Sequence, residues 1–575
     1  MVLAKTIGAP EKTTYTAVAG RAVQNPDDAA ELRRAFRTVL VLAVLALGLR
    51  VLWGTVVATT VEREGSFYAR LAQNIAHRRG YLGIREQGLQ LIYPPLFPLL
   101  IALQNSLGIP ADLAGRLISA VASAAFVPLA FLLAYRLYGI RVARIAAILA
   151  AIHPLLVVFG AAVLTEMTYL TLIWAGVYFA LQMLDDQRFT PALLAGTMFG
   201  LGYLTRPEAM LLPPIVAAWF VLFAKGRRSF AVKRALALVG VFGALAAPYI
   251  IFLYLQTGQL RFEAKTAEGR VFSRMVAAGI PIDQIYHGVD PDLTERGLSM
   301  IPNLAIIRMA HSSPRDVLDP MINAAKSNLP RFLAELGGGL YFGNPVLFGL
   351  AVLGLFSTAW SREQLVCQSL IIAVSATAVL ALTSWPYWHE RFQFPLAAVF
   401  ILWGAAGLTV LARWTSDTLR NVGVDATRAV KPGQMTLVLT IVALVGISAA
   451  GVRHLDEVSD GWSFRSDKEV GLWMRTLKSP PRRLADTGPI VAFYSGAALT
   501  LFPHCAPDVA LRYFQLKGVD TIVLRTSATP ELWMFDWIQN GIPSPRAELI
   551  AKIAQPDGTA FIIYRFHGRD HEIAR

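Results

Sequence analysis

Four short polar segments interrupt a largely apolar chain, and they hold the residues that could do chemistry. The first holds Glu64, between Arg63 and Gly65. A carboxylate partly shielded from water can have its pKa raised and act as a general base. The alternative is a solvated acid at a helix start, where it interacts favourably with the helix dipole.

The second segment holds Glu166, which lies between two apolar stretches. A lone carboxylate there is costly unless it is paired or lines a polar cavity, which makes Glu166 a candidate site residue. Alternatively, Thr165 caps the following helix and Glu166 simply favours its N-terminus.

The third segment holds Arg206 and Glu208, on either side of Pro207. A guanidinium facing a cavity at membrane level is a good phosphate ligand, because its donors match paired phosphate oxygens. As a plain surface pair, Arg206 and Glu208 would contribute only about 0–1 kcal/mol.

The fourth segment holds His389, Glu390 and Arg391, directly after a run of aromatic residues. Tryptophan and tyrosine are expected at the end of any membrane span, but that does not account for the three polar residues. A cation here lies at the depth of lipid phosphates. Arg391 is therefore a candidate for holding an anionic head group.

The composition requires that membrane helices position these segments. Of 575 residues, 55% are hydrophobic and 16% are charged, and the mean hydropathy is +0.49; soluble proteins carry about 25% charged residues. The net charge of +14 fits basic loops retained in the cytoplasm rather than a nucleic-acid partner. The sequence has no phosphate-binding glycine loop, dinucleotide motif or zinc-spaced Cys/His cluster. It leaves open whether a divalent cation takes part.

Apolar runs of about 20 residues predict a polytopic α-helical membrane protein with about eleven spans. The predicted spans are 38–60, 113–138, 142–160, 167–184, 191–204, 209–224, 235–255, 341–359, 366–383, 396–412 and 435–451. Basic clusters in residues 1–37, 225–234 and 413–434 fall on one side when the spans are counted alternately, so that side is the cytoplasm. An odd number of spans places the C-terminus outside.

This topology predicts a cytoplasmic tail of residues 1–37, a transmembrane domain of residues 38–451, and an outside C-terminal domain of residues 452–575. Two long outside loops, 61–112 and 256–340, interrupt the transmembrane domain. All four polar segments then face the outside.

Two outside segments have a predictable local structure. Residues 64–75 carry apolar side chains at helical spacing, which predicts an amphipathic helix lying on the membrane surface. In the tail, residues 490–494, 521–524 and 561–564 are predicted to be short strands between helices, so a small α/β domain is expected.

The order of the polar segments resembles a known family. An acid followed four residues later by tyrosine (Glu64, Tyr68), and then the run Tyr93-Pro94-Pro95, resembles the first outside loop of the membrane-embedded GT-C glycosyltransferases. The chain is most similar to their bacterial branch related to protein O-mannosyltransferases and the lipid A aminoarabinose transferase. Residues 164–166, 204–208 and 391–395 resemble later blocks, so the likeness spans roughly residues 38–450.

The resemblance implies a glycosyltransferase of the bacterial inner membrane. Such an enzyme moves a hexosyl or pentosyl group from a polyprenyl-phosphate carrier to a glycan, lipid or protein acceptor outside the membrane, usually with inversion. Glu64 would be the general base and Glu166 would orient the acceptor or the sugar. The family often has a second acid where this chain has Gly65, so a paired-carboxylate site at that point does not follow.

The resemblance also implies a substrate-binding set. The leaving phosphate needs positive charge rather than a general acid. The residues assigned to substrate binding are Tyr68, Arg70, Tyr93, Arg206, Glu208, His389, Glu390 and Arg391.

Two other functions compete with the enzyme hypothesis. Charges in apolar helices also mark the substrate paths of transporters and flippases for lipid-linked or anionic substrates. Transporters often contain repeated halves with matching broken helices, which this sequence lacks, and large outside loops favour an outward-facing site. A structural or sensory membrane protein whose tail binds a partner is the third alternative.

Overall fold

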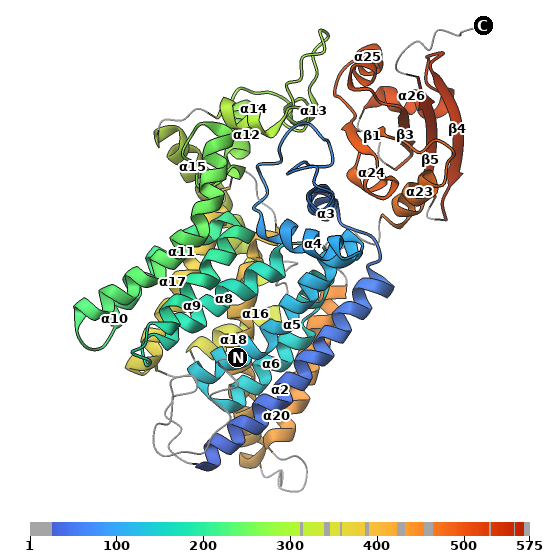
Figure 1. Cartoon of the computed structure of the whole chain (residues 1–575). Helices are drawn as coiled ribbons and strands as arrows, with labels where there is room; N and C mark the ends of the chain where they lie inside the picture. Colours follow the sequence, from blue (N-terminus) through green and yellow to red (C-terminus); the bar gives the residue numbers. More distant parts are fainter. Residues whose placement is uncertain are drawn as a thin grey trace.

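A computed structural model shows a bundle of long helices with a small sheet domain beside one end (Figure 1). The residues that the structure describes are 26–310, 314–338, 345–356, 359–385, 390–422, 432–452, 464–527, 531–556 and 558–567. The bundle end that carries residues 61–110 and 258–310 is called the loop end below.

Each predicted span corresponds to a helix or to a short run of helices. In chain order these are α2 (Pro26–Leu52) with the π-helical turn η2 (Trp53–Val57), α5 (Ala111–Tyr138), α6 (Ile140–Ile152) with α7 (Pro154–Gly160), α8 (Glu166–Gln182), α9 (Thr190–Thr205), η3 (Pro207–Leu211) with α10 (Leu212–Phe223), α11 (Arg228–Thr257), α16 (Pro345–Phe356), α17 (Arg362–Thr383), α18 (Ala397–Asn421) after η4 (Glu390–Leu396), and α20 (Pro432–Val452).

The bundle is that of a multi-pass membrane protein. Among the described residues, five helices are long and apolar enough to cross a bilayer, and α6 with α7, bent by 51°, would make a sixth. Apolar side chains on α2 such as Val41, Val44 and Leu45 are 61–68% exposed, as expected of a helix that faces lipid. The polytopic helical fold is confirmed, while the count of about eleven spans stays a prediction.

Arg50 lies fully buried inside the first predicted span. Its guanidinium donates to the carbonyls of Ala150 and Ala151, at 3.0 and 2.8 Å. Because Pro154 carries no N–H, α6 ends there and leaves carbonyls without helical donors. Arg50 supplies those donors and so stabilises the bend between α6 and α7.

The loop end is built from short helices of both predicted outside loops. They are α3 (Arg63–Ala76), α4 (Leu96–Ser106), α12 (Lys265–Ala277), α13 (Ile282–His287), α14 (Asn303–Met309) and α15 (Pro314–Gly338). Residues 64–75 form the predicted amphipathic helix, as α3, and its place at the membrane surface stays a prediction. The apolar face of α3 is buried within the protein, where Tyr68 and Ala72 share a core with Ile490 and Val491 of the sheet domain.

The C-terminal residues form the expected small α/β domain. Its elements are α23 (Arg465–Arg475), β1 (Arg483–Asp486), α24 (Pro489–Ser495), β2 (Ala498–Leu501), α25 (Pro507–Lys517), β3 (Thr521–Arg525), α26 (Leu532–Asn540), β4 (Ala547–Ala554) and β5 (Ala560–Phe566). The sheet order is β2-β1-β3-β5-β4, with β2, β1 and β3 parallel and β5 antiparallel to its neighbours.

The structure confirms two of the three predicted strand segments, as β3 and β5. The third is wrong, because residues 490–494 form the helix α24. Pro489 at the first helical position and Gly496 in the left-handed region mark its two ends.

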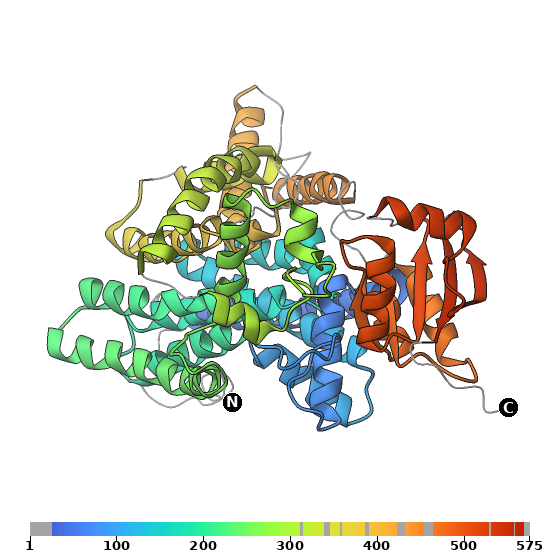
Figure 2. The ribbon, with the colours of Figure 1, turned by 90° about the horizontal axis from the view of Figure 1, so that it is seen from above.

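The sheet domain stands to one side of the bundle and is attached to both predicted outside loops (Figures 1 and 2). The amide of Leu499 donates to the carbonyl of Ile84 at 2.9 Å, which fixes the first loop. The amide of His504 donates to the carbonyl of His287 at 2.7 Å, which fixes the second. The two loops therefore share one support.

Candidate active site

Three predicted site residues meet at the loop end, each placed by a local feature of its segment. Glu166 is the first residue of α8. Arg206 is extended, with φ −147° and ψ 129°, because the residue before a proline avoids the helical region, and α9 therefore ends at Thr205. Arg391 lies in the short helix η4 that leads into α18.

Arg391 joins the two predicted catalytic carboxylates. Its Nη1 lies 3.0 Å from Oε2 of Glu64, and its Nε lies 3.1 Å from Oε1 of Glu166, which Nη2 also contacts. Arg206 reaches the same Oε1 of Glu166 through Nη1, at 3.2 Å. The side chain of Glu166 is 2% exposed, whereas that of Glu64 is 33% exposed, so Glu64 is the more open of the two to an incoming group.

Tyr68, Tyr93 and Glu208 complete this cluster. The hydroxyl of Tyr68 donates to Oε1 of Glu64 at 3.1 Å, since residues four apart share a helix face. The Tyr93 ring lies 4.7 Å from the Tyr68 ring. Glu208 lies 3.5 Å from Arg206. These three predicted residues are therefore brought to the site.

The charges around Glu64 reverse the expected direction of its pKa shift. Burial acts to raise the pKa of Glu64, as the sequence led us to expect. The cations of Arg391, Lys265 and Arg206 outweigh burial and lower that pKa to about 2. Glu64 is therefore a carboxylate at neutral pH, and its basicity is held down by the cations that surround it.

Lys265, the first residue of α12, is a functional candidate that the sequence analysis missed. Its ammonium lies 5.3 Å from the ring centre of Trp385. Burial acts to raise the pKa of Glu208, but the charges of Arg206 and Lys265 act more strongly in the other direction. The net shift of the Glu208 pKa is therefore downward. Nothing in the second outside loop distinguishes Lys265 from the other basic residues there.

Two carboxylate oxygens in the cluster are available for hydrogen bonds. Oε2 of Glu166 and Oε2 of Glu208 are buried and have no hydrogen-bond partner among the described residues. A buried acceptor without a donor costs about 1–3 kcal/mol. Hydroxyl groups of a ligand could supply the missing donors.

Gly65 leaves no room for a second acid at its position. A Cβ atom there would lie 2.7 Å from Oε2 of Glu62 and 2.8 Å from the carbonyl of Val163. Glu62 instead accepts a hydrogen bond from the amide of Val163 at 2.9 Å, which holds α3 against the turn before α8. The second carboxylate of the cluster comes from α8, as Glu166.

The structure does not bring every predicted residue to the cluster. Arg70 is buried under the sheet domain, where it donates to the carbonyls of Ala492 (2.8 Å), Gly496 (3.0 Å) and Ala497 (3.1 Å). It therefore caps the C-terminal end of α24. His389 lies outside the described residues, and Glu390 is described only as the first residue of η4.

The described residues contain no group of three or more His, Cys, Asp or Glu side chains that could hold a metal ion. The cluster combines carboxylates with cations instead. Such an arrangement can accept a proton at Glu64 and hold an anion at Arg391, Arg206 and Lys265.

Comparisons with known proteins give the fold a family context. The family model described as dolichyl-phosphate-mannose-protein mannosyltransferase matches residues 93–252. A search of curated protein sequences finds no match.

Two solved structures resemble the whole chain. ArnT from Cupriavidus metallidurans, bound to undecaprenyl phosphate, is 13% identical with a TM-score of 0.56, over 93% of this chain and 98% of that one. The archaeal oligosaccharyltransferase AglB from Archaeoglobus fulgidus, in complex with an inhibitory peptide and a dolichol-phosphate, is 14% identical with a TM-score of 0.52, over 94% and 74%. The resemblance to GT-C glycosyltransferases is confirmed, and the chain has their fold.

Proposed function

We propose that this GT-C-fold membrane protein transfers a sugar from a polyprenyl-phosphate carrier to an acceptor on the outer face of a bacterial inner membrane. The observation that carries this proposal is the guanidinium of Arg391, which contacts both Glu64 and Glu166. A candidate base and a candidate phosphate ligand are thus in direct contact. The printed titles of the two similar structures, which name undecaprenyl phosphate and a dolichol-phosphate, support the lipid carrier.

The donor phosphate would bind to Arg391, Arg206 and Lys265. These three cations balance the three carboxylates of the cluster, Glu64, Glu166 and Glu208. The leaving group is the polyprenyl phosphate, an anion that positive charge stabilises without a proton donor. The cations therefore do the work that a general acid does in other glycosyl transfers.

Glu64 would act as the base in a single inverting displacement. It accepts the proton of the acceptor hydroxyl while that oxygen forms a bond to the anomeric carbon. The bond from that carbon to the phosphate oxygen breaks, and its electron pair stays on the phosphate. Glu166, with one oxygen free of partners among the described residues, would hold a sugar hydroxyl.

Domain organisation and orientation follow from the same proposal. Residues 38–451 would form the transferase domain, with the loop end outside the membrane, and residues 452–575 the outside α/β domain. The cluster would then lie where a lipid-linked sugar presents its phosphate at the outer surface.

The test replaces Glu64 with Gln in proteoliposomes supplied with a panel of polyprenyl-phosphate hexoses and pentoses. General base catalysis contributes about 10²–10⁴-fold, so release of polyprenyl phosphate should fall by that factor. Glu548→Gln, at a side chain that is 75% exposed in the sheet domain, is the matched control and should keep the full rate.

If Glu64→Gln releases polyprenyl phosphate at a rate close to that of the unmodified protein, Glu64 is not the base. Movement of intact donor across the bilayer, without release of polyprenyl phosphate from any donor in the panel, would instead identify a flippase.

A further inference from the structure

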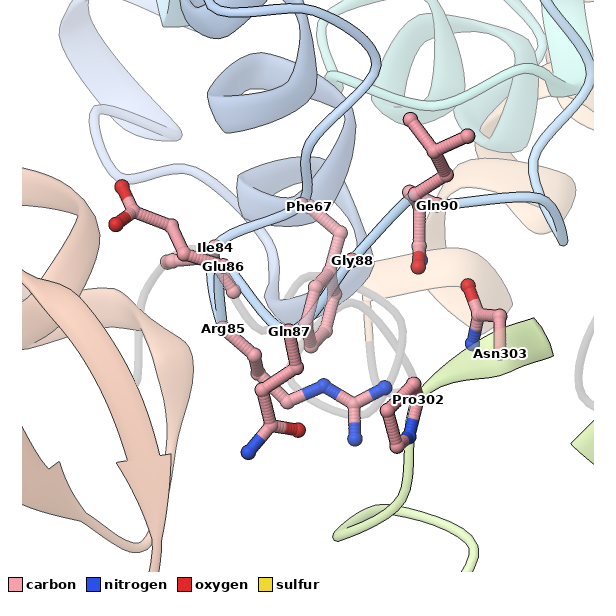
Figure 3. A pocket seen from close by; sticks show the side chains of 11 residues that line it. Phe67, Ile84, Arg85, Glu86, Gln87, Gly88, Gln90, Pro302 and Asn303 are labelled. Carbon is pink, nitrogen blue, oxygen red and sulfur yellow. The ribbon is translucent and has the colours of Figure 1, made fainter. Parts of the chain in front are cut away.

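A second polar site lies at the loop end, between the two predicted outside loops. It is a shallow pocket formed by the turn of residues 83–90, by Pro302 and Asn303 at the start of α14, and by Phe67 of α3 (Figure 3). The space in it that a water-sized group can occupy is about 20 Å³, which is room for one such group. None of its lining residues belongs to the ion cluster.

Phe67 connects this pocket to the reacting carboxylate. It follows Glu64 by three residues on α3, so the two side chains share a helix face. Both are partly exposed, whereas Tyr68 and Leu71 are buried. In Figure 3 the Phe67 ring lies between Arg85 and Gln87 on one side and Gln90 and Asn303 on the other.

Asn303 presents an unused donor to the pocket. It is 3% exposed, and its Oδ1 accepts a hydrogen bond from the amide of Leu91 at 3.2 Å. That bond fixes which amide atom is the acceptor, so Nδ2 is the donor. Nδ2 has no hydrogen-bond partner among the described residues. A buried donor in this state costs about 1–3 kcal/mol and is expected to meet a ligand group.

Gln87 has an unused acceptor below the Phe67 ring in the view of Figure 3, next to the Arg85 guanidinium. Its Oε1 is buried and also lacks a hydrogen-bond partner among the described residues. Arg85, beside it, is already engaged, because its guanidinium donates to the carbonyl of Ser299. Its own carbonyl accepts a hydrogen bond from Arg483 of β1 at 3.0 Å. The pocket walls are thus fixed by both loops and by the sheet domain.

These groups match the chemistry of a sugar ring. An aromatic face packs against the C–H face of a sugar, and flanking amides exchange hydrogen bonds with its hydroxyls. The pocket is lined by one cation and one anion, Arg85 and Glu86, whose charges cancel, so an anion gains little there. The small volume admits one hydroxyl, with the ring lying over Phe67. A peptide chain would instead need a row of backbone partners.

We infer that this pocket binds one uncharged sugar ring of the acceptor, stacked on Phe67 with its hydroxyls on Asn303 and Gln87. The role of that sugar as acceptor rests on the proposed function, but its binding does not. The acceptor hydroxyl would then be offered to Glu64 from the next turn of the same helix.

The experiment measures saturation transfer by NMR from the full-length protein in nanodiscs. The probes are methyl glycosides of glucose, galactose, mannose, N-acetylglucosamine and arabinose, and a blocked peptide that contains threonine. Asn303→Asp keeps the acceptor oxygen for Leu91 and removes the donor, and Phe67→Leu keeps an apolar side chain without the ring. Gln284→Glu, at an exposed residue of the second loop, is the control for an added charge.

We expect ring-proton saturation of at least one glycoside in the unmodified protein. It should fall about fivefold or more in Asn303→Asp, since one hydrogen bond contributes about 1 kcal/mol, and it should also fall in Phe67→Leu, which loses the aromatic face. It should persist in Gln284→Glu and in Glu64→Gln. Loss of transfer with retained glycoside binding in Glu64→Gln separates this inference from the proposed function.

Three outcomes would overturn the inference. One is equal glycoside saturation in the unmodified protein and both pocket variants. Another is no glycoside signal above that of Phe67→Leu, which would mean that the pocket holds only water. The third is saturation of the peptide alone that the pocket variants abolish.

Discussion

One guanidinium sets the charge state of two carboxylates in this site. Arg391 contacts Glu64 and Glu166, and it is the foremost of the cations that lower the pKa of Glu64 to about 2. A carboxylate this acidic is a weak base. A donor phosphate that engages Arg391 would weaken its hold on Glu64 and so raise the basicity of Glu64. Donor binding would thereby prepare the base for the acceptor.

This coupling predicts the pH dependence of transfer. A base works only when deprotonated, so the acid limb of kcat/KM lies at the pKa of Glu64 in the free enzyme. With that pKa at about 2, the unmodified protein should show no limb from Glu64 above about pH 4. Arg391→Gln removes the cation that lowers the pKa of Glu64 most, while burial still raises that pKa. The acid limb should therefore move to higher pH.

The measurement is kcat/KM for the donor from about pH 4 to pH 8. Arg420→Gln, at a side chain that is 71% exposed, is the control and should keep the unmodified profile. If the Arg391→Gln profile falls only in amplitude, with no shift of its acid limb, Arg391 does not set the charge of Glu64.

The helix α3 carries the reacting group on one face and its support on the other. Glu64 and Phe67 face the site, while Gly65 packs against the turn before α8 and Arg70 caps α24. The sequence pattern identified the apolar face of this helix correctly. The pattern could not say that protein rather than lipid covers that face, because the partner helix lies more than 400 residues later in the chain.

Gly65→Ala tests the close approach of α3 to the turn before α8. The added methyl group would meet the carbonyl of Val163 at 2.8 Å, so α3 must shift. We expect a loss of about 1–3 kcal/mol in unfolding free energy, together with slower transfer. Gly48→Ala, in open space on α2, is the matched control and should be neutral or slightly stabilising. Equal thermal midpoints of the two variants would contradict the packing argument.

Arg70→Met tests whether Arg70 supports the sheet domain or binds substrate. Removing its guanidinium leaves the carbonyls of Ala492, Gly496 and Ala497 without these donors. We expect faster hydrogen exchange in α24, a lower thermal midpoint, and a nearly unchanged KM for the donor. Arg79→Met, at an exposed residue of the same loop, should change none of these. A raised KM for the donor with unchanged hydrogen exchange in α24 would instead indicate that Arg70 binds substrate.

At the scale of the whole molecule, composition and apolar run length predicted the helical membrane fold, because lipid imposes long apolar helices on any chain that crosses it. The order of the polar segments predicted that Glu64, Glu166, Arg206 and Arg391 belong together, and the structure brings them into contact. These predictions succeeded because each rests on a pattern within one segment or on a fixed side of the membrane.

The residues and shifts that were missed share a different cause. Lys265 and Asn303 come from a loop with no recognisable pattern, and their importance depends on which distant residues they meet. The pKa of Glu64 shifts downward because three cations from three other segments surround it. Tertiary contacts of this kind are not encoded in local spacing. The strand predicted at residues 490–494 failed for another reason, because the proline and glycine at their ends are local signals that favour a short helix.

The support that the sheet domain gives to both outside loops has a consequence for biosynthesis. A ribosome makes the bundle first, so its helices enter the membrane before residues 483–504 exist. During that interval Ile84 and His287 lack their hydrogen bonds to Leu499 of β2 and to His504, three residues after β2. The nascent chain would therefore be inserted but not yet organised at its loop end. The loop end would become organised only after the last hundred or so residues have been made.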